Sequence, residues 1–210
     1  MLLTKVCGMK NKDNIQALIR LNPDFIGYIF YPKSSRYVEP EIAHSLTEKV
    51  PSLIKKVGVF VNSSIEEILD KVISLRLDFV QLSGNESLSF VKKIHHANIP
   101  IIKAVHVNDL EELEKTAEFS PYIDKFLFDT KTDAFGGSGL KFDWNILHSY
   151  TGDAPFFLSG GIGPDDAKDI LAFRHPKFEG IDINSKFEIE PGLKNIELIR
   201  SFLVTIRACI

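Results

Sequence analysis

The chain has 210 residues, of which 44% are hydrophobic and 25% are charged, and its formal net charge is -3. This length suits a single domain, and the composition is that of a globular protein with enough apolar residues for a core. The weak negative charge argues against nucleic acid or an anionic membrane as a partner, so local groups would have to hold an anionic substrate.

Only two cysteines occur, Cys7 and Cys209, and no Cys/His cluster has the spacing of a zinc site. We therefore expect no metal and two reduced thiols. The segment MLLTKVCGMKNKDN lacks the basic and apolar regions of a secretory signal, and no apolar run approaches the ~18 residues of a membrane span. These features predict a cytoplasmic protein.

Eight short runs rich in Val, Ile and Phe recur along the chain, flanked by Gly, Pro, Asn or Asp. This pattern predicts β-strands. The predicted strands are LLTKVC (2–7), FIGYIF (25–30), KVGVFV (56–61), DFVQL (78–82), PIIKAV (100–105), DKFLFD (124–129), PFFLS (155–159) and GIDIN (180–184).

Segments with helical periodicity lie between most of these runs. The apolar positions of 65–73 recur at helical spacing, and Ser64 followed by Glu67 has the pattern of a capping box. Further helices are predicted at 13–21, 40–50, 86–97, 110–119, 165–173 and 195–207, with a shorter one at 142–150.

Strand and helix thus alternate about eight times, which predicts parallel strands joined by right-handed crossovers. Such units can close into a barrel or form an open doubly wound sheet. The predicted elements run from residue 2 to the C-terminus, and no G-x-G-x-x-G motif follows the first strand. Both features favour a single-domain α/β fold, a (β/α)8 TIM barrel over residues 1–210 with few insertions.

In such a barrel the active site lies at the C-terminal ends of the strands. Cys7 ends the first strand, on the same face as Leu3 and Lys5. It is compatible with a reactive thiolate or with a small buried hydrophobic residue. Asp129 ends the apolar run KFLF, where a carboxyl can serve as a general acid near neutral pH or as a helix cap.

Backbone N–H groups after the seventh and eighth strands can form a phosphate site, the common position in these barrels. The residues there are Gly160, Gly161, Asn184 and Ser185, although turn formation alone also accounts for the glycines. Arg36, in the loop YPKSSRYV, can clamp a carboxylate bidentately or be an ordinary surface arginine.

Three other features point less clearly to function. GGSG (136–139) suits a mobile lid or a flexible connector. Trp144, the only tryptophan, is expected in the core, and His106 near the barrel mouth is weak evidence alone.

Several stretches together resemble the phosphoribosylanthranilate isomerase family, in the family's order and from end to end. YPKSSRYV and KVCG are the most specific. The matching stretches are KVCGM (5–9), DFIGYIFYPKSSRYV (24–38), VGVFVN (57–62), VQLSGNE (80–86), LFDT (127–130), GGSGLKFDW (136–144), FLSGGIGPDD (157–166) and GIDINSKFE (180–188).

The resemblance implies an Amadori rearrangement of N-(5-phosphoribosyl)anthranilate in tryptophan biosynthesis, with no cofactor. It implies that Asp129 is the general acid of ring opening and that Cys7 is the general base that removes the C2′ proton. Arg36 would hold the anthranilate carboxylate, and Asp182 would contact the polar centre of the substrate. The phosphate would be cradled by Gly160, Gly161, Asn184 and Ser185.

The chain departs from the family pattern at two places. Family members commonly have His-Gly-Asp after the fourth strand, whereas this chain has Ser83-Gly84-Asn85, so Ser83 is expected where a histidine would contact the substrate. Ser185-Lys186 replaces the usual Ser-Gly, which alters the phosphate loop or adds a positive charge beside it.

Two alternative readings remain. The histidine-pathway enzyme that performs the same rearrangement carries a carboxylate at the end of its first strand, where this chain has Cys7. A non-catalytic phosphate-binding barrel would not need Cys7, Asp129 and Arg36 together. The sequence leaves open whether the protein is a monomer or a homodimer.

Overall fold

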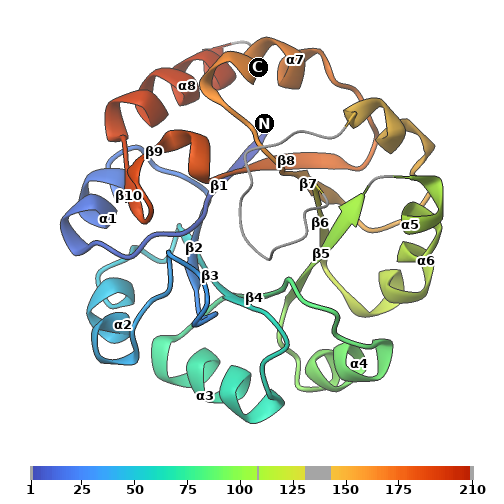
Figure 1. The fold of residues 1–210 in the computed structure, drawn as a ribbon, viewed down its shortest axis with the longest axis horizontal. Coiled ribbons are helices and arrows are strands. Elements are labelled where there is room, and N and C mark those ends of the chain that lie inside the picture. Colours follow the sequence, from blue (N-terminus) through green and yellow to red (C-terminus); the bar gives the residue numbers. More distant parts are fainter. Residues whose placement is uncertain (1, 108, 131–142, 209–210) are drawn as a thin grey trace.

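The computed structural model of the chain describes residues 2–107, 109–130 and 143–208. Eight parallel strands close into a barrel, because β1 pairs with both β2 and β8 (Figure 1). The strands are β1 (Leu3–Val6), β2 (Phe25–Ile29), β3 (Lys55–Phe60), β4 (Phe79–Leu82), β5 (Ile101–Val107), β6 (Lys125–Thr130), β7 (Phe156–Leu158) and β8 (Phe178–Ile183). The predicted TIM barrel is confirmed, and each strand begins and ends within two residues of its predicted bounds.

Helices form a ring around the barrel (Figure 1). They are α1 (Lys12–Ile19), α2 (Pro40–Thr47), α3 (Ile65–Leu75), α4 (Leu88–His96), α5 (Leu110–Glu114), α6 (Thr116–Phe119), α7 (Ala167–Ala172) and α8 (Ile196–Ala208), with 3-10 turns at Ser120–Tyr122, Trp144–Ser149, Pro164–Asp166 and Ser185–Phe187. Ser64 caps α3 as predicted, its hydroxyl accepting from the Glu67 N–H. Among the described residues, no helix is long and apolar enough to cross a bilayer.

Two local predictions were wrong in detail, and one element was missed. The helix expected at 110–119 is divided at Lys115, where the Thr116 hydroxyl bonds back to the Leu113 carbonyl. The segment expected as a helix at 142–150 is a 3-10 helix in its described part. A short antiparallel hairpin, β9 (Glu188–Glu190) and β10 (Leu193–Lys194), was not predicted at all.

The apolar residues form two layers, one between strands and helices and one inside the barrel. Strand alternation explains the division, because Val6 and Phe128 point outward while their neighbours point inward. Inside, Phe25 packs edge-on against Phe79 and Phe157 with ring centroids 5.6 and 5.3 Å apart. The inner layer consists of Leu3, Phe25, Val57, Phe79, Ile102, Ala104, Leu127 and Phe157.

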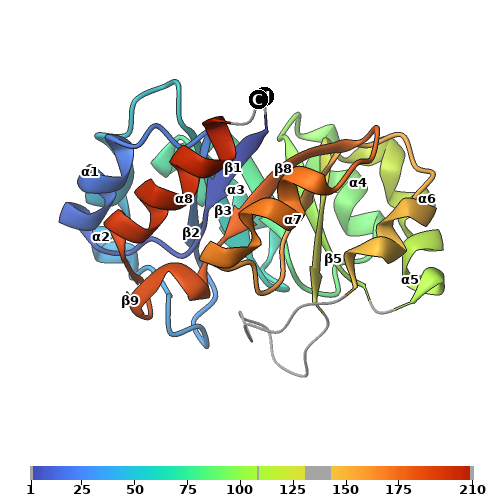
Figure 2. The same cartoon turned by 90° about the horizontal axis from the view of Figure 1, so that it is seen from above.

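The same alternation places polar residues above this inner layer, toward the carboxyl ends of the strands. On β1 the inward positions are Leu3, Lys5 and then Cys7, and on β6 they are Leu127 and then Asp129. Figure 2 shows the β9–β10 hairpin on the face opposite to the one where β1 begins. Polar residues therefore line the end of the barrel on that face, above the apolar inner layer.

Candidate active site

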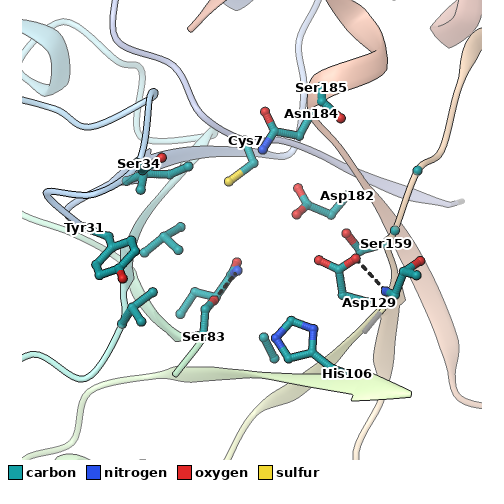
Figure 3. A pocket seen from close by; sticks show the side chains of 18 of the residues that line it. Cys7, Tyr31, Ser34, Ser83, His106, Asp129, Ser159, Asp182, Asn184 and Ser185 are labelled. Atoms are coloured by element: carbon teal, nitrogen blue, oxygen red, sulfur yellow. Dashed lines mark hydrogen bonds between the residues drawn. The ribbon is translucent and has the colours of Figure 1, made fainter. Parts of the chain in front are cut away.

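A pocket opens at the carboxyl ends of the strands, where the barrel rule places an active site. Figure 3 shows the Cys7 sulfur and the carboxyls of Asp182 and Asp129 around one space. The described lining residues include Cys7, Tyr31, Ser34, Gln81, Ser83, His106, Asp129, Thr130, Ser159, Gly160, Gly161, Asp182, Asn184 and Ser185. All the predicted site residues except Arg36 line this pocket.

Cys7 lies just past the end of β1, where its N–H donates to the Ile183 carbonyl across the β1–β8 seam. Its side chain is only 3% exposed, although it lines the pocket. Gly27 on β2 makes room for the thiol, because a Cβ there would lie 2.7 Å from the sulfur. Burial raises the pKa of the Cys7 thiol, and the Lys5 ammonium opposes that rise.

Lys5 and Asp182 form a buried ion pair at the floor of the pocket. The Lys5 ammonium lies 3.0 Å from Asp182 Oδ1, and the two residues are partners in the β1–β8 register. Burial alone would lower the pKa of Lys5, but attraction by Asp182 and by the Cys7 thiol outweighs it and raises that pKa. Lys5 therefore remains an ammonium.

Asp129 stands at the other side of the pocket, and its Oδ1 accepts from the Thr130 N–H at 2.7 Å. Burial raises its pKa to about 6, against the lowering influence of His106 and of that hydrogen bond. Gly160 packs closely against this end of β6: its φ is 82°, and a Cβ would lie 2.4 Å from Thr130 Oγ1 and 2.9 Å from Asp129 Oδ1. Close packing is thus sufficient reason for a glycine at 160.

The residues predicted to bind phosphate lie together on one wall of the pocket. Gly160 and Gly161 follow β7, and Asn184 and Ser185 follow β8. In the turn that follows, the Gly163 N–H donates to the Asp166 carboxylate of its own turn, so this N–H is already occupied. Lys186 is exposed and does not line the pocket.

Arg36 sits at the pocket's edge, where it is already paired. Its Nε and Nη2 donate to the two Glu188 oxygens at 2.9 and 2.7 Å, and Lys194 donates to the same carboxylate at 2.6 Å. Burial would raise the pKa of Glu188, but Arg36 and Lys194 outweigh it and lower that pKa. Two cations share one carboxylate, so this edge keeps a net positive charge. Sequence reasoning missed Glu188 and Lys194 because it missed the hairpin that carries them.

Ser83, the departure from the family pattern, does line the pocket and accepts a hydrogen bond from Gln81 at 2.9 Å. Gln81 Oε1 and His106 Nδ1 are buried beside it without a hydrogen-bond partner among the described residues. Alternation along β4 would have identified Gln81, because it shares a face with Ser83. This wall thus presents polar atoms that a ligand can satisfy.

Of the remaining predictions, two concern residues that the structure does not describe and one concerns the core. GGSG (136–139) and Cys209 lie outside the described residues, whereas Trp144 packs against the core as expected. No group of three or more His, Cys, Asp or Glu in the described ranges is arranged to hold a metal. The absence of a metal or cofactor from the reaction stays a prediction.

An eight-stranded parallel barrel with a polar pocket at the carboxyl ends of its strands is the architecture of a (β/α)8-barrel enzyme. The profile of the N-(5'phosphoribosyl)anthranilate (PRA) isomerase family matches residues 4–205. The N-(5'-phosphoribosyl)anthranilate isomerase of Parabacteroides distasonis is 45% identical over 96% of this chain and 92% of its own. The chain therefore belongs to the phosphoribosylanthranilate isomerase family.

Solved structures agree with this assignment. The phosphoribosyl anthranilate isomerase of Thermotoga maritima superposes with a TM-score of 0.90 at 33% identity, covering 99% of this chain and 100% of that one. A structure of such an isomerase in complex with reduced 1-(o-carboxyphenylamino)-1-deoxyribulose 5-phosphate gives a TM-score of 0.85 at 29% identity, covering 99% of this chain and 100% of that one.

Proposed function

We propose that the chain is a phosphoribosylanthranilate isomerase, which converts N-(5-phosphoribosyl)anthranilate into 1-(2-carboxyphenylamino)-1-deoxyribulose 5-phosphate in tryptophan biosynthesis. Its family membership supports this, and one structural observation carries it: the thiol after β1 and the carboxyl of β6 line a single pocket. A base and an acid around one space are what an Amadori rearrangement needs.

Asp129 acts in the first step, ring opening. Its carboxyl protonates the furanose oxygen as the bond from that oxygen to C1′ breaks and the anthranilate nitrogen forms an iminium with C1′. An acid of pKa about 6 retains enough proton to do this near neutral pH. The Thr130 N–H, 2.7 Å from Oδ1, then stabilises the carboxylate that remains.

Cys7 acts in the second step, as a thiolate that removes the C2′ proton. The electrons of the broken C–H bond form a double bond between C1′ and C2′, and the iminium electrons return to nitrogen. The resulting enolamine tautomerises to the ketone. Because the iminium is the electron sink, the chemistry itself requires neither a metal nor a cofactor.

Binding is divided between two edges of the pocket. The phosphate lies against Gly160, Gly161, Asn184 and Ser185, and the anthranilate carboxylate lies toward Arg36. The net positive charge of the cluster formed by Arg36, Lys194 and Glu188 supports that placement. Asp182 and Ser83 contact the polar centre of the substrate from the floor and from the β4 wall.

The surroundings of the reaction follow from the same proposal. The protein acts in the cytoplasm on a small phosphorylated substrate, without nucleic acid or membrane, and its low cysteine content supports that compartment. Residues 1–210 form a single domain in this proposal, which acts as a monomer or a homodimer.

A fluorescence assay with freshly made phosphoribosylanthranilate tests the proposal. The purified protein should consume the substrate, and inorganic phosphate should compete with it. The reduced product analogue named above should inhibit more strongly than phosphate, because it also fills the carboxylate end. A protein that binds the analogue but leaves the substrate unchanged would be a non-catalytic barrel, and the proposal would be wrong.

A further inference from the structure

Lys5 is a fully buried cation to which the mechanism above gives no part. Its side chain is 0% exposed, inside the barrel and between the apolar floor and the pocket. A buried ion pair gives little net stability, because removing both charges from water offsets most of their attraction. Packing alone therefore does not explain a lysine at this position.

The two neighbours of the Lys5 ammonium connect it to the pocket. On one side it donates to Asp182 Oδ1 at 3.0 Å. On the other side lies Cys7, two residues further along the same inward face of β1, whose thiolate form the ammonium attracts. Asp182 and Cys7 both line the pocket. Lys5 is thus placed beneath the sulfur, which it can attract only when that sulfur is a thiolate.

The groups that face Cys7 show how unevenly charge is distributed around it. β2 contributes the uncharged Gly27, β8 contributes Asp182, which raises the pKa of the thiol, and the hairpin contributes Lys194, which lowers that pKa. Lys194 is already bound to Glu188 at 2.6 Å and to Asn184 Oδ1 at 2.7 Å. Lys5 has a stronger influence on the thiol than Lys194 has.

We propose that Lys5 is a positioning residue for the base: its ammonium, fixed in place by Asp182, stabilises the negative charge that the Cys7 sulfur carries when it acts in the pocket. This inference rests on the proposed role of Cys7. Asp182 therefore has two tasks, since it anchors Lys5 below and faces the substrate above.

The test measures the thiolate directly, without substrate. In a Cys209→Ser background Cys7 is the only cysteine, so its rate of alkylation by iodoacetamide against pH reports its ionisation. Lys5→Met should move the midpoint of this profile to higher pH by at least about one unit, the usual effect of losing a cation this near. Turnover at neutral pH should fall about tenfold for each unit of that movement.

Two further variants separate electrostatics from folding. Lys103→Met is the matched control, because Lys103 is also buried and paired, with Glu86 at 3.1 Å, but does not act on Cys7. It should leave the alkylation profile unchanged. The double variant Lys5→Met/Asp182→Asn removes both charges, so it should fold even if Lys5→Met alone does not. The midpoint of its alkylation profile should still lie at a higher pH than that of the parent.

The outcomes are distinct. If the double variant alkylates with the parent's profile, Lys5 serves only to neutralise Asp182 and the inference is overturned. The same holds if Lys103→Met moves the midpoint as far as Lys5→Met does. A shifted profile in a protein that does not consume phosphoribosylanthranilate would support the coupling of Lys5 to Cys7 while ending the proposed function.

Discussion

The two reactive groups of the pocket share one buried environment, but the acid requires a raised pKa and the base requires a lowered one. Cys7 at the β1 end and Asp129 at the β6 end are both desolvated, and in both cases burial raises the pKa. For the acid this is useful, because a carboxyl with a pKa of about 6 is protonated in a far larger fraction of molecules near neutrality than one with its usual pKa. For the base the same rise is a handicap, because it keeps the thiol protonated.

The charges placed at each end reflect this difference. Lys5 and Lys194 lie at the β1 end, where both lower the pKa of Cys7. At the β6 end the uncharged Thr130 N–H donates to Asp129, and burial outweighs the lowering influence of His106 and Lys5 on the pKa of that carboxyl. Burial thus favours the protonated acid, whereas a buried base needs a cation beside it to offset the same effect.

The largest expected effect comes from removing either reactive group. Cys7→Ser and Asp129→Asn should each lower turnover at least ~10²-fold, the usual contribution of a general base or acid. Steady-state turnover measured by substrate fluorescence, with circular dichroism as the control for folding, provides the check. Full activity in either variant would remove that residue from the mechanism.

Moving the base without deleting it should have the next largest effect. In Gly27→Ala the new Cβ would lie 2.7 Å from the Cys7 sulfur, so the thiol must shift, and turnover should fall roughly 10- to 100-fold. Gly58→Ala on β3 is the control, because its Cβ would meet Leu77 and Phe60 instead. That variant should lose stability and keep its turnover. Equal turnover in both variants would contradict the position assigned to Cys7.

Arg36 tests whether the positive edge beside the β1 end binds substrate. Arg36→Ala should raise KM about tenfold with a smaller change in kcat, as expected for a lost charged hydrogen bond. Lys186→Ala should leave KM within about twofold, because Lys186 is exposed and off the pocket. An unchanged KM in Arg36→Ala would show that Arg36 does not bind the substrate and serves only to pair with Glu188.

The smallest effect concerns stability at the β6 end. A carboxyl whose folded pKa is raised from 3.8 to about 6 favours folding below its unfolded pKa and loses that contribution as pH rises through about 6. Asp129→Asn should therefore raise the free energy of unfolding by about 1–2 kcal/mol at pH 8, a value reduced by solvent at this half-buried site. Urea denaturation at pH 8 and pH 4 measures it, and an equal gain at both would refute the assignment.

Local patterns predicted much of this arrangement. Period-two alternation correctly set Cys7 on the face of Leu3 and Lys5, and the alternation of strands and helices predicted a parallel sheet. Closure into a barrel was predicted from the span of the elements and from the missing G-x-G-x-x-G motif. The hairpin of β9 and β10 was not predicted, because its sequence EIEPGLK is short, charged and interrupted by Pro and Gly. Its Glu188 bonds Arg36 across 152 residues, and no local pattern signals a contact so distant.

The seam between β1 and β8 has a consequence for how activity arises during synthesis. Lys5 and its carboxylate partner are separated by 177 residues, nearly the full span of the chain. A ribosome-bound chain that has not yet released its eighth strand possesses the thiol but not the anchor beneath it. Competence for catalysis must therefore emerge late and all at once, and a truncation before residue 182 should leave an inert protein however well its earlier strands have formed.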